Sequence, residues 1–171
     1  MFKTKLAGAL TAATLCASAA TADTIVDIAA GDERFSTLVA AVGAAELAEA
    51  LSGPGPFTVF APVNQAFEAL PEGTVDTLLQ PENRDQLTAV LLYHVDDREL
   101  TSNMLPAGST PIRPMLEDAR LCITAGSDGV TIADSTGEAA NVIIADIQAD
   151  NGVIHVIDKV LLPGETYPAC H

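Results

Sequence analysis

The sequence predicts an α+β fold in which helices in the first part of the chain pack on an antiparallel sheet formed by the last part. Apart from one strand-like segment at 57–60, residues 35–94 carry apolar side chains at helical spacing, whereas the residues after Val95 form short apolar segments between turn residues. Helices that precede strands are typical of α+β proteins, and the sheet must bury one face on the helices. With 171 residues and 49% hydrophobic composition, the chain can build one domain with a core and is not a disordered tail.

The first helix is predicted by an apolar stripe at positions i, i+3, i+4 and i+7, which consists of Phe35, Leu38, Val39 and Val42. Asp32 or Ser36 can cap this helix. Gly43 ends or kinks it, and the apolar pattern then continues through Leu47 and Leu51 to a stop in the Gly- and Pro-rich segment that follows.

A strand is predicted at residues 57–60, which alternate as a strand does, and it ends at Pro62. Asn64 is placed to cap the short helix that comes next. Two further helices have apolar faces, which are Val75, Leu78 and Leu79 in the first and Leu87, Val90, Leu91 and His94 in the second. Asn83 can cap the second of these helices.

The later strands are predicted from apolar segments at residues 121–125, 130–133, 142–147 and 153–162. The first two flank Gly126-Ser127-Asp128-Gly129, which we expect to be a four-residue hairpin loop. Asn151-Gly152 is a turn signal between the last two. Two prolines argue against a central strand at residues 110–114.

Three segments, in their order and spacing, resemble motifs of the fasciclin domain: GPFTVFAPVNQAF at 55–67, LLYHV at 91–95 and DIQADNGVIHVIDKVLLP at 146–163. The resemblance covers residues 24–163. It implies a fasciclin-like antiparallel β-wedge flanked by a group of short α-helices, with the strand at 57–60 in the same sheet system as the last strand. It also implies that Tyr93 and His94 support the fold near the first strand. We assign structural roles to motif residues of these segments: Tyr93, His94, Phe57, Phe60, Pro62, Gly152 and His155.

The first 22 residues have the pattern of a signal peptide. Lys3 and Lys5 precede an apolar, Ala-rich stretch that is too short to span a bilayer, and Ala20-Thr21-Ala22 supplies small residues for cleavage. The predicted organisation is a cleaved signal peptide at 1–22, a fasciclin-like domain at 23–163 and a tail at 164–171. We therefore expect an exported protein, periplasmic or extracellular, that does not span the membrane.

The chain is strongly acidic, with a formal net charge of -15 that becomes -17 when Lys3 and Lys5 are removed with the signal peptide. An acidic surface without a basic stripe makes nucleic acid and anionic membrane surfaces poor partners, so we expect no nucleic-acid partner. Cys122 and Cys170 remain after the predicted cleavage, and a pair of cysteines in an exported chain favours a disulfide. The alternative is two free thiols, one on a buried strand and one on a frayed tail.

None of the three histidines is predicted to be catalytic or to bind a metal. His94 lies on the apolar face of its helix, which indicates a core histidine held by one hydrogen bond, and His155 alternates with Val153 and Ile157 in a strand. His171 is the last residue. The acidic segment 146–152 lacks the ligand spacing of a calcium loop, and no zinc, phosphate-loop or nucleophile motif is present. We expect no cofactor.

Asp146 and Ile147 are the candidate binding residues. The resemblance implies a role in partner recognition, because the matching Asp-Ile dipeptide of animal matrix proteins is associated with integrins. The structural alternative, which we favour, is a strand end with Ile147 buried and Asp146 capping a turn.

The sequence therefore predicts a secreted or periplasmic, non-enzymatic adhesion and interaction module whose partner is a cell-surface or matrix protein or glycan. The alternative is an extracytoplasmic binding protein for a small molecule or glycan. A preformed apolar pocket with convergent polar groups would favour that alternative, and a flat exposed patch would favour adhesion. An enzyme that uses His94 or His155 ranks third.

Overall fold

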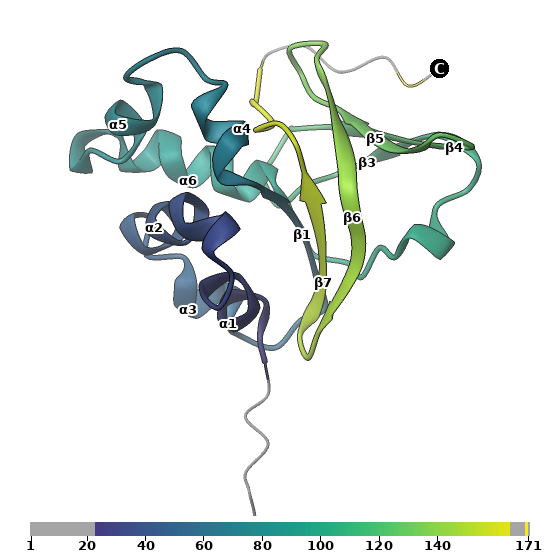
Figure 1. The fold of residues 1–171 in the computed structure, drawn as a ribbon, viewed down its shortest axis with the longest axis horizontal. Coiled ribbons are helices and arrows are strands. Elements are labelled where there is room, and N and C mark those ends of the chain that lie inside the picture. Colours follow the sequence, from purple (N-terminus) through teal and green to yellow (C-terminus); the bar gives the residue numbers. More distant parts are fainter. Residues whose placement is uncertain (1–22, 165–169, 171) are drawn as a thin grey trace, which may run out of the picture.

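The computed structural model describes residues 23–164 and residue 170, with helices first and strands later (Figure 1). The α-helices are α1 Ile25–Ala30, α2 Ser36–Ala44, α3 Ala48–Leu51, α4 Asn64–Glu68, α5 Thr74–Leu78 and α6 Arg84–Tyr93. Short 3-10 helices are η1 Glu33–Phe35, η2 Pro81–Asn83 and η3 Ser102–Met104. The strands are β1 Phe57–Pro62, β2 Val95–Asp96, β3 Gly108–Ile112, β4 Leu121–Gly126, β5 Gly129–Ala133, β6 Ala139–Ala149 and β7 Gly152–Ile157. The predicted signal peptide and His171 lie outside the described residues.

The strands of the described part form one curled sheet in the order β2-β1-β7-β6-β5-β4-β3. β1 and β7 are parallel, from Phe57 opposite Gly152 to Pro62 opposite Ile157, and the other neighbouring pairs are antiparallel. The first and last strands therefore lie in the same sheet, as expected, and they are also neighbours in it. The predicted antiparallel sheet is a mixed sheet, because the long connection from β1 to β7 lets the two strands run in the same direction.

β1 and β7 are buried on both faces and separate two apolar clusters. Helices α1, α2, α3 and α6 lie on one side of these strands, and β3, β4 and β5 lie on the other (Figure 1). The first cluster joins helix residues such as Leu38 and Leu91 to Val59 and Ile154 of the central strands. The second cluster lies inside the curl of the sheet and includes Phe60, Tyr93, Leu121, Ile132 and Ile157. Burial on both faces explains why β7 has an almost continuous apolar sequence.

Two glycines allow the chain to close tightly where β1 begins beside β7. A Cβ atom on Gly152 would lie 2.0 Å from the carbonyl oxygen of Phe57, and one on Gly55 would lie 1.9 Å from the carbonyl oxygen of Asn151. The Phe57 N–H donates to that same Asn151 oxygen at 3.0 Å. Only glycine fits at positions 55 and 152, because any side chain would push the backbones apart.

Asn64 does not cap its own helix, so that prediction was wrong. The residue before α4 is Val63, whose side chain makes no capping bond. The Asn64 amide instead accepts from the Thr37 N–H at 3.1 Å and donates to the Glu33 carbonyl at 2.9 Å. Asn64 therefore satisfies a free backbone donor in the first turn of α2, which lies 27 residues earlier in the chain.

Two other local predictions were also wrong in detail. The Asn83 side chain donates to the Thr77 carbonyl at 2.8 Å and so joins α5 to α6 instead of capping α6. Gly126 pairs with Gly129, so that Ser127 and Asp128 alone form the hairpin loop between β4 and β5. β3, which contains Pro111, is the last strand in the sheet order, where a proline is tolerated.

Candidate functional site

The centre of β6 is irregular where the candidate binding residues lie. Val142 pairs with Ile157, Ile144 with Val156 and Ile147 with Ile154, so β6 contains extra residues on both sides of Ile144. Asp146 has a φ of 58°, in the left-handed region that Asp tolerates better than most residues. Such bulges bend a strand and redirect its side chains. The dipeptide Asp146-Ile147 therefore lies inside a distorted strand, which continues to Ala149, and not at a strand end.

The Asp146 carboxylate holds the segment that follows β2. One oxygen accepts from the Ser102 N–H at 2.7 Å, and the other accepts from the Ser102 hydroxyl. Partial burial acts to raise the pKa of Asp146, but the hydrogen bonds from Ser102 and the nearby His155 outweigh it and lower this pKa. Asp146 is therefore ionised at neutral pH. Ile147 is half-buried and packs against the first apolar cluster.

His155 holds the same segment from the neighbouring strand β7. Its Nε2–H donates to the Leu100 carbonyl at 2.6 Å, and its Nδ1 accepts from the Asp146 N–H at 3.3 Å. The ring stacks on Phe60, with ring centroids 5.8 Å apart. Both ring nitrogens are thus engaged within the protein.

Thr58 of β1 adds a third attachment. Its hydroxyl donates to the Arg98 carbonyl at 2.5 Å and accepts from the Leu100 N–H at 2.8 Å. The adjacent strands β1, β7 and β6 thus each supply one polar side chain to residues 98–102, which we call the anchored segment. Its attachment fixes the backbone beside the β6 bulges.

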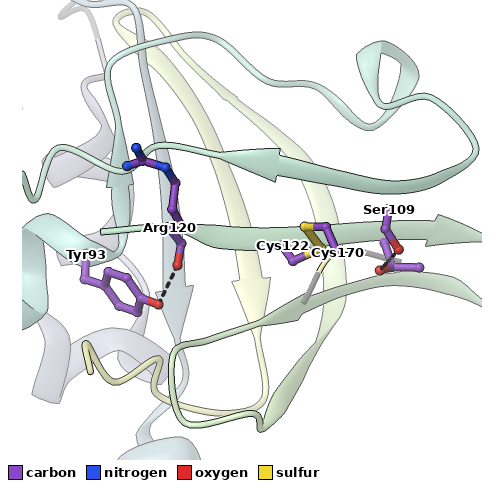
Figure 2. Close-up of a disulfide and its surroundings, with 6 residues drawn as sticks. Tyr93, Ser109, Arg120, Cys122 and Cys170 are labelled. Atoms are coloured by element: carbon purple, nitrogen blue, oxygen red, sulfur yellow. Dashed lines mark hydrogen bonds between the residues drawn. A yellow bond between two sulfur atoms is a disulfide. The ribbon is translucent and has the colours of Figure 1, made fainter. Parts of the chain in front are cut away.

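Tyr93 and His94 connect the end of α6 to both apolar clusters. The Tyr93 hydroxyl donates to the Arg120 carbonyl at 2.9 Å (Figure 2). It also accepts from the Ser135 N–H at 3.0 Å. His94 Nδ1 donates to the Val90 carbonyl at 2.7 Å, and its Nε2 accepts from the Leu161 N–H at 2.9 Å. His94 is therefore a buried histidine with two hydrogen bonds where one was expected.

His94 is uncharged at neutral pH. Burial lowers its pKa to about 4, although the hydrogen bond to Val90 and the charge of Asp134 act in the opposite direction. Burial likewise raises the pKa of the Tyr93 phenol, which the hydrogen bonds from Ser135 offset only in part. Both side chains therefore act as neutral hydrogen-bonding groups inside the fold.

A disulfide joins Cys122 of β4 to Cys170, with Cα atoms 5.6 Å apart (Figure 2). Cys122 is buried, and it pairs with Pro111 on β3 and with Ala133 on β5. The disulfide therefore links Cys170 to β4, the strand that lies between β3 and β5 in the sheet.

A pocket of about 150 Å³ lies in the first apolar cluster, between helices α1, α2 and α3 on one side and strands β1 and β7 on the other. Its lining is apolar except for His94. Among its lining residues, Gly43 is exposed and Val26, Val39 and Ala48 are half-exposed, so the pocket opens to solvent beside Gly43, among α1, α2 and α3.

The fasciclin domain family model matches residues 33–163, which is most of the chain. This chain belongs to the fasciclin domain family. Protein sll1483 of Synechocystis sp. is 53% identical over 140 residues, covering 82% of this chain and 73% of that protein. Transforming growth factor-beta-induced protein ig-h3 of Sus scrofa is 40% identical over 145 residues, covering 85% of this chain and 20% of that protein.

The fold is that of solved fasciclin domains. The FAS1 domain pair from the insect cell adhesion molecule fasciclin I is similar with a TM-score of 0.70 at 21% sequence identity, covering 81% of this chain and 50% of the pair. Members of the family are generally non-enzymatic adhesion modules. No helix among residues 23–164 has the length and apolar character that crossing a membrane requires.

In this fasciclin domain, apolar side chains are exposed beside Asp146. Ile143 and Ile144 are 53% and 37% exposed, because the bulges interrupt the alternation that would turn one of them inward. Met104, which is 63% exposed, lies two residues after Ser102 on η3. We call Ile143, Ile144 and the Asp146 carboxylate the β6 face.

Sequence reasoning missed the polar residues that hold the domain together across long separations. Neither Thr58 nor Ser102 is singled out in the sequence analysis. Asn151 was read only as a turn signal, although its side chain accepts from the Ile25 N–H at 2.9 Å and donates to the Leu51 carbonyl at 2.7 Å and the Gly53 carbonyl at 3.0 Å. The turn that contains Asn151 is the only local feature of the sequence at this position. A turn does not indicate which groups the side chain binds, and its hydrogen-bond partners lie 98 to 126 positions away in the sequence.

Proposed function

We propose that this fasciclin domain is a secreted or periplasmic, non-enzymatic adhesion module that binds a cell-surface or matrix protein or glycan through its β6 face. The observation that carries the proposal is the pair of exposed isoleucines beside an ionised, rigidly held aspartate. A group of exposed apolar side chains with polar groups at its rim is a feature of protein–protein interaction sites. Membership of a family of adhesion modules supports the same function.

The state of the histidines supports a non-enzymatic role. A general acid or base needs a ring nitrogen within reach of a substrate. In His94 and in His155, both ring nitrogens are hydrogen-bonded to the protein, and both side chains are 3% exposed. Their hydrogen bonds support the fold and leave no ring nitrogen for a substrate.

The β6 face also changes the expected role of Asp146. Both of its carboxylate oxygens are held by Ser102, so the aspartate positions the anchored segment and presents a fixed negative charge. The isoleucines then supply the apolar contact area of the binding surface. Export, which the signal-peptide pattern predicts, would bring this face to the cell surface.

Cell attachment to surfaces coated with the protein tests the proposal. We expect more attached cells of the host, or of a neighbouring species, than on an equally acidic control protein. The excess should persist at 0.1 M salt, where exposed charges are screened beyond about 10 Å. Attachment equal to that on the control protein would contradict an adhesion function.

Substitutions in the β6 face locate the binding surface. Ile143→Ser with Ile144→Ser should reduce attachment while the domain stays folded at the assay temperature, because both side chains are partly exposed and lie outside the two apolar clusters. Met115→Ser is the matched control, since Met115 is an exposed apolar residue at 40% exposure on the segment between β3 and β4. Equal loss of attachment in both variants would mean that general surface hydrophobicity, and not the β6 face, mediates binding.

A further inference from the structure

The apolar pocket between the helices and the sheet has the properties of a ligand site that is separate from the β6 face. Its volume of about 150 Å³ exceeds the small voids of a close-packed interior. A water molecule would not be stabilised in this pocket, because a buried water needs hydrogen bonds to two to four polar groups. Cavities of this size with aliphatic linings stay dry and accept small apolar molecules.

The one polar side chain in the lining cannot bind a ligand. His94 donates to Val90 through Nδ1 and accepts from Leu161 through Nε2, so the ring presents only carbon atoms to the pocket. The other lining residues are aliphatic or glycine, such as Val39, Leu91 and Ile154. The pocket therefore offers dispersion contacts and the removal of apolar surface from water, without a hydrogen bond or a charge.

The pocket has an entrance. Gly43 lines it near the end of α2, and a Cβ atom built on Gly43 would meet no atom within 4 Å beyond its chain neighbours and the backbone of its own helix. Val39, one turn earlier on the same helix face, is half-exposed, and so is Ala48 across the mouth on α3. A glycine in the last turns of a helix weakens it, and here it leaves the space between α2 and α3 open.

We propose that this pocket binds a compact, uncharged, apolar molecule of about the size of one aromatic ring, which enters between α2 and α3 beside Gly43. Sugars and charged metabolites are excluded, because their polar groups would lose water and find no partner in the pocket. The net charge of -15 further disfavours anions. This site is independent of adhesion, so one activity can be lost while the other is kept.

Toluene and benzoate are matched probes, since they have similar size and differ in charge. We expect toluene to cause saturable shifts of methyl resonances in the pocket lining, above all those of Val39, Leu91 and Ile154. It should also raise the melting temperature in proportion to the logarithm of its concentration once it is in excess. Benzoate should do neither.

Substitutions that fill the mouth test the location. Gly43→Leu and Ala48→Leu should each weaken toluene binding by at least about tenfold. Gly126→Leu is the control, because Gly126 also has no atom within 4 Å of a built Cβ but lies on β4, away from the pocket. Circular dichroism melts check that each variant is folded.

Three results would overturn the proposal. The first is the absence of saturable methyl shifts up to the solubility of toluene. The second is binding of toluene and benzoate alike, which indicates a surface effect. The third is unchanged toluene binding in folded Gly43→Leu and Ala48→Leu. Cell attachment, measured on the same variants, should be unchanged whichever result is obtained.

Discussion

Asp146 binds Ser102 through both carboxylate oxygens, one accepting the Ser102 N–H at 2.7 Å and the other its hydroxyl, across 44 positions of sequence. The contact joins a bulged position of β6 to the segment that follows β2. Hydrogen bonds to an ionised group are stronger than those between neutral groups. This pair therefore fixes the anchored segment and holds the backbone next to Ile143 and Ile144.

Asp146→Ala should lower the free energy of unfolding by about 1–3 kcal/mol, because the Ser102 N–H loses its charged acceptor. Urea unfolding measures this loss. The hydrogen bonds lower the pKa of Asp146, so their contribution is present above the ordinary carboxyl pKa and is lost as the pH falls through the lower pKa of the folded state. Ser102→Ala keeps the backbone bond and should cost less. An unchanged unfolding midpoint in Asp146→Ala would show that the carboxylate serves only at the surface.

His94 should make the fold less stable in mild acid. The pKa of His94 is lowered to about 4 in the folded protein, whereas the ordinary value in an unfolded chain is 6.5. Above the ordinary value neither state is protonated. As the pH falls from there towards 4, only the unfolded state binds the proton, so stability decreases by up to about 1.4 kcal/mol per pH unit, and the loss levels off when the native ring protonates.

Comparison with His94→Gln isolates this effect. At pH 8 His94 is neutral in the folded and the unfolded chain, so the difference in stability between the two proteins reflects only the hydrogen bonds to Val90 and Leu161. The variant should then be less stable by about 1–3 kcal/mol. At pH 5 the gap between the two proteins should narrow, because only the native sequence loses stability by His94 titration. A gap of constant size from pH 8 to pH 5 would show that His94 titrates normally.

The disulfide should stabilise the domain chiefly by restricting the unfolded chain. Cys122 and Cys170 are separated by 48 positions, and closing such a loop contributes about 4 kcal/mol in the chain-entropy model. Reduction, or Cys122→Ser with Cys170→Ser, should therefore lower the melting temperature. Mass spectrometry without reductant should find no alkylatable thiol on either residue. Two reactive thiols in the native protein would contradict the bond.

The sequence predicted what local chemistry and the family motifs determine. Apolar spacing located α2, α6 and the hairpin of β4 and β5, and the motif containing Phe57 placed β1 in the same sheet system as β7. The parallel direction of β1 and β7 and the need for glycine at position 152 could not be derived, because both depend on how closely Phe57 approaches Gly152 in the folded chain. Local patterns contain no such distance.

The errors arise where contacts between distant parts of the chain, or irregularities within a strand, decide the structure. Asn64 has a suitable position in the sequence to cap α4, but α2 lies close enough in space for the Thr37 N–H to donate to the Asn64 side chain instead. Asp146 was expected at the end of a strand, because residues 142–147 read as a continuous strand before a turn. The bulges on both sides of Ile144 change which residues face solvent, and the apolar sequence gives no sign of them. The pocket was not predicted either, since it depends on packing between α2 and α3.

Asn151 should be one of the most sensitive polar residues of the domain. Its side chain joins the start of α1, the end of α3 and the β6–β7 turn, through the Ile25 N–H and the carbonyl groups of Leu51 and Gly53. Asn151→Ala leaves these half-buried groups without their partner and should cost about 2–4 kcal/mol. Asn151→Asp keeps an acceptor for Ile25 but sets a carboxylate against two carbonyl groups, so it should be at least as damaging.

Asn141→Ala is the control for the Asn151 variants. Asn141 is exposed, and its side chain donates to the Asp158 carboxylate at 2.8 Å, so removing this bond should cost about 1 kcal/mol or less. The urea concentration at the unfolding midpoint measures the stability of the three variants. Equally small decreases in stability for the substitutions at Asn151 and Asn141 would show that Asn151 is an ordinary turn residue.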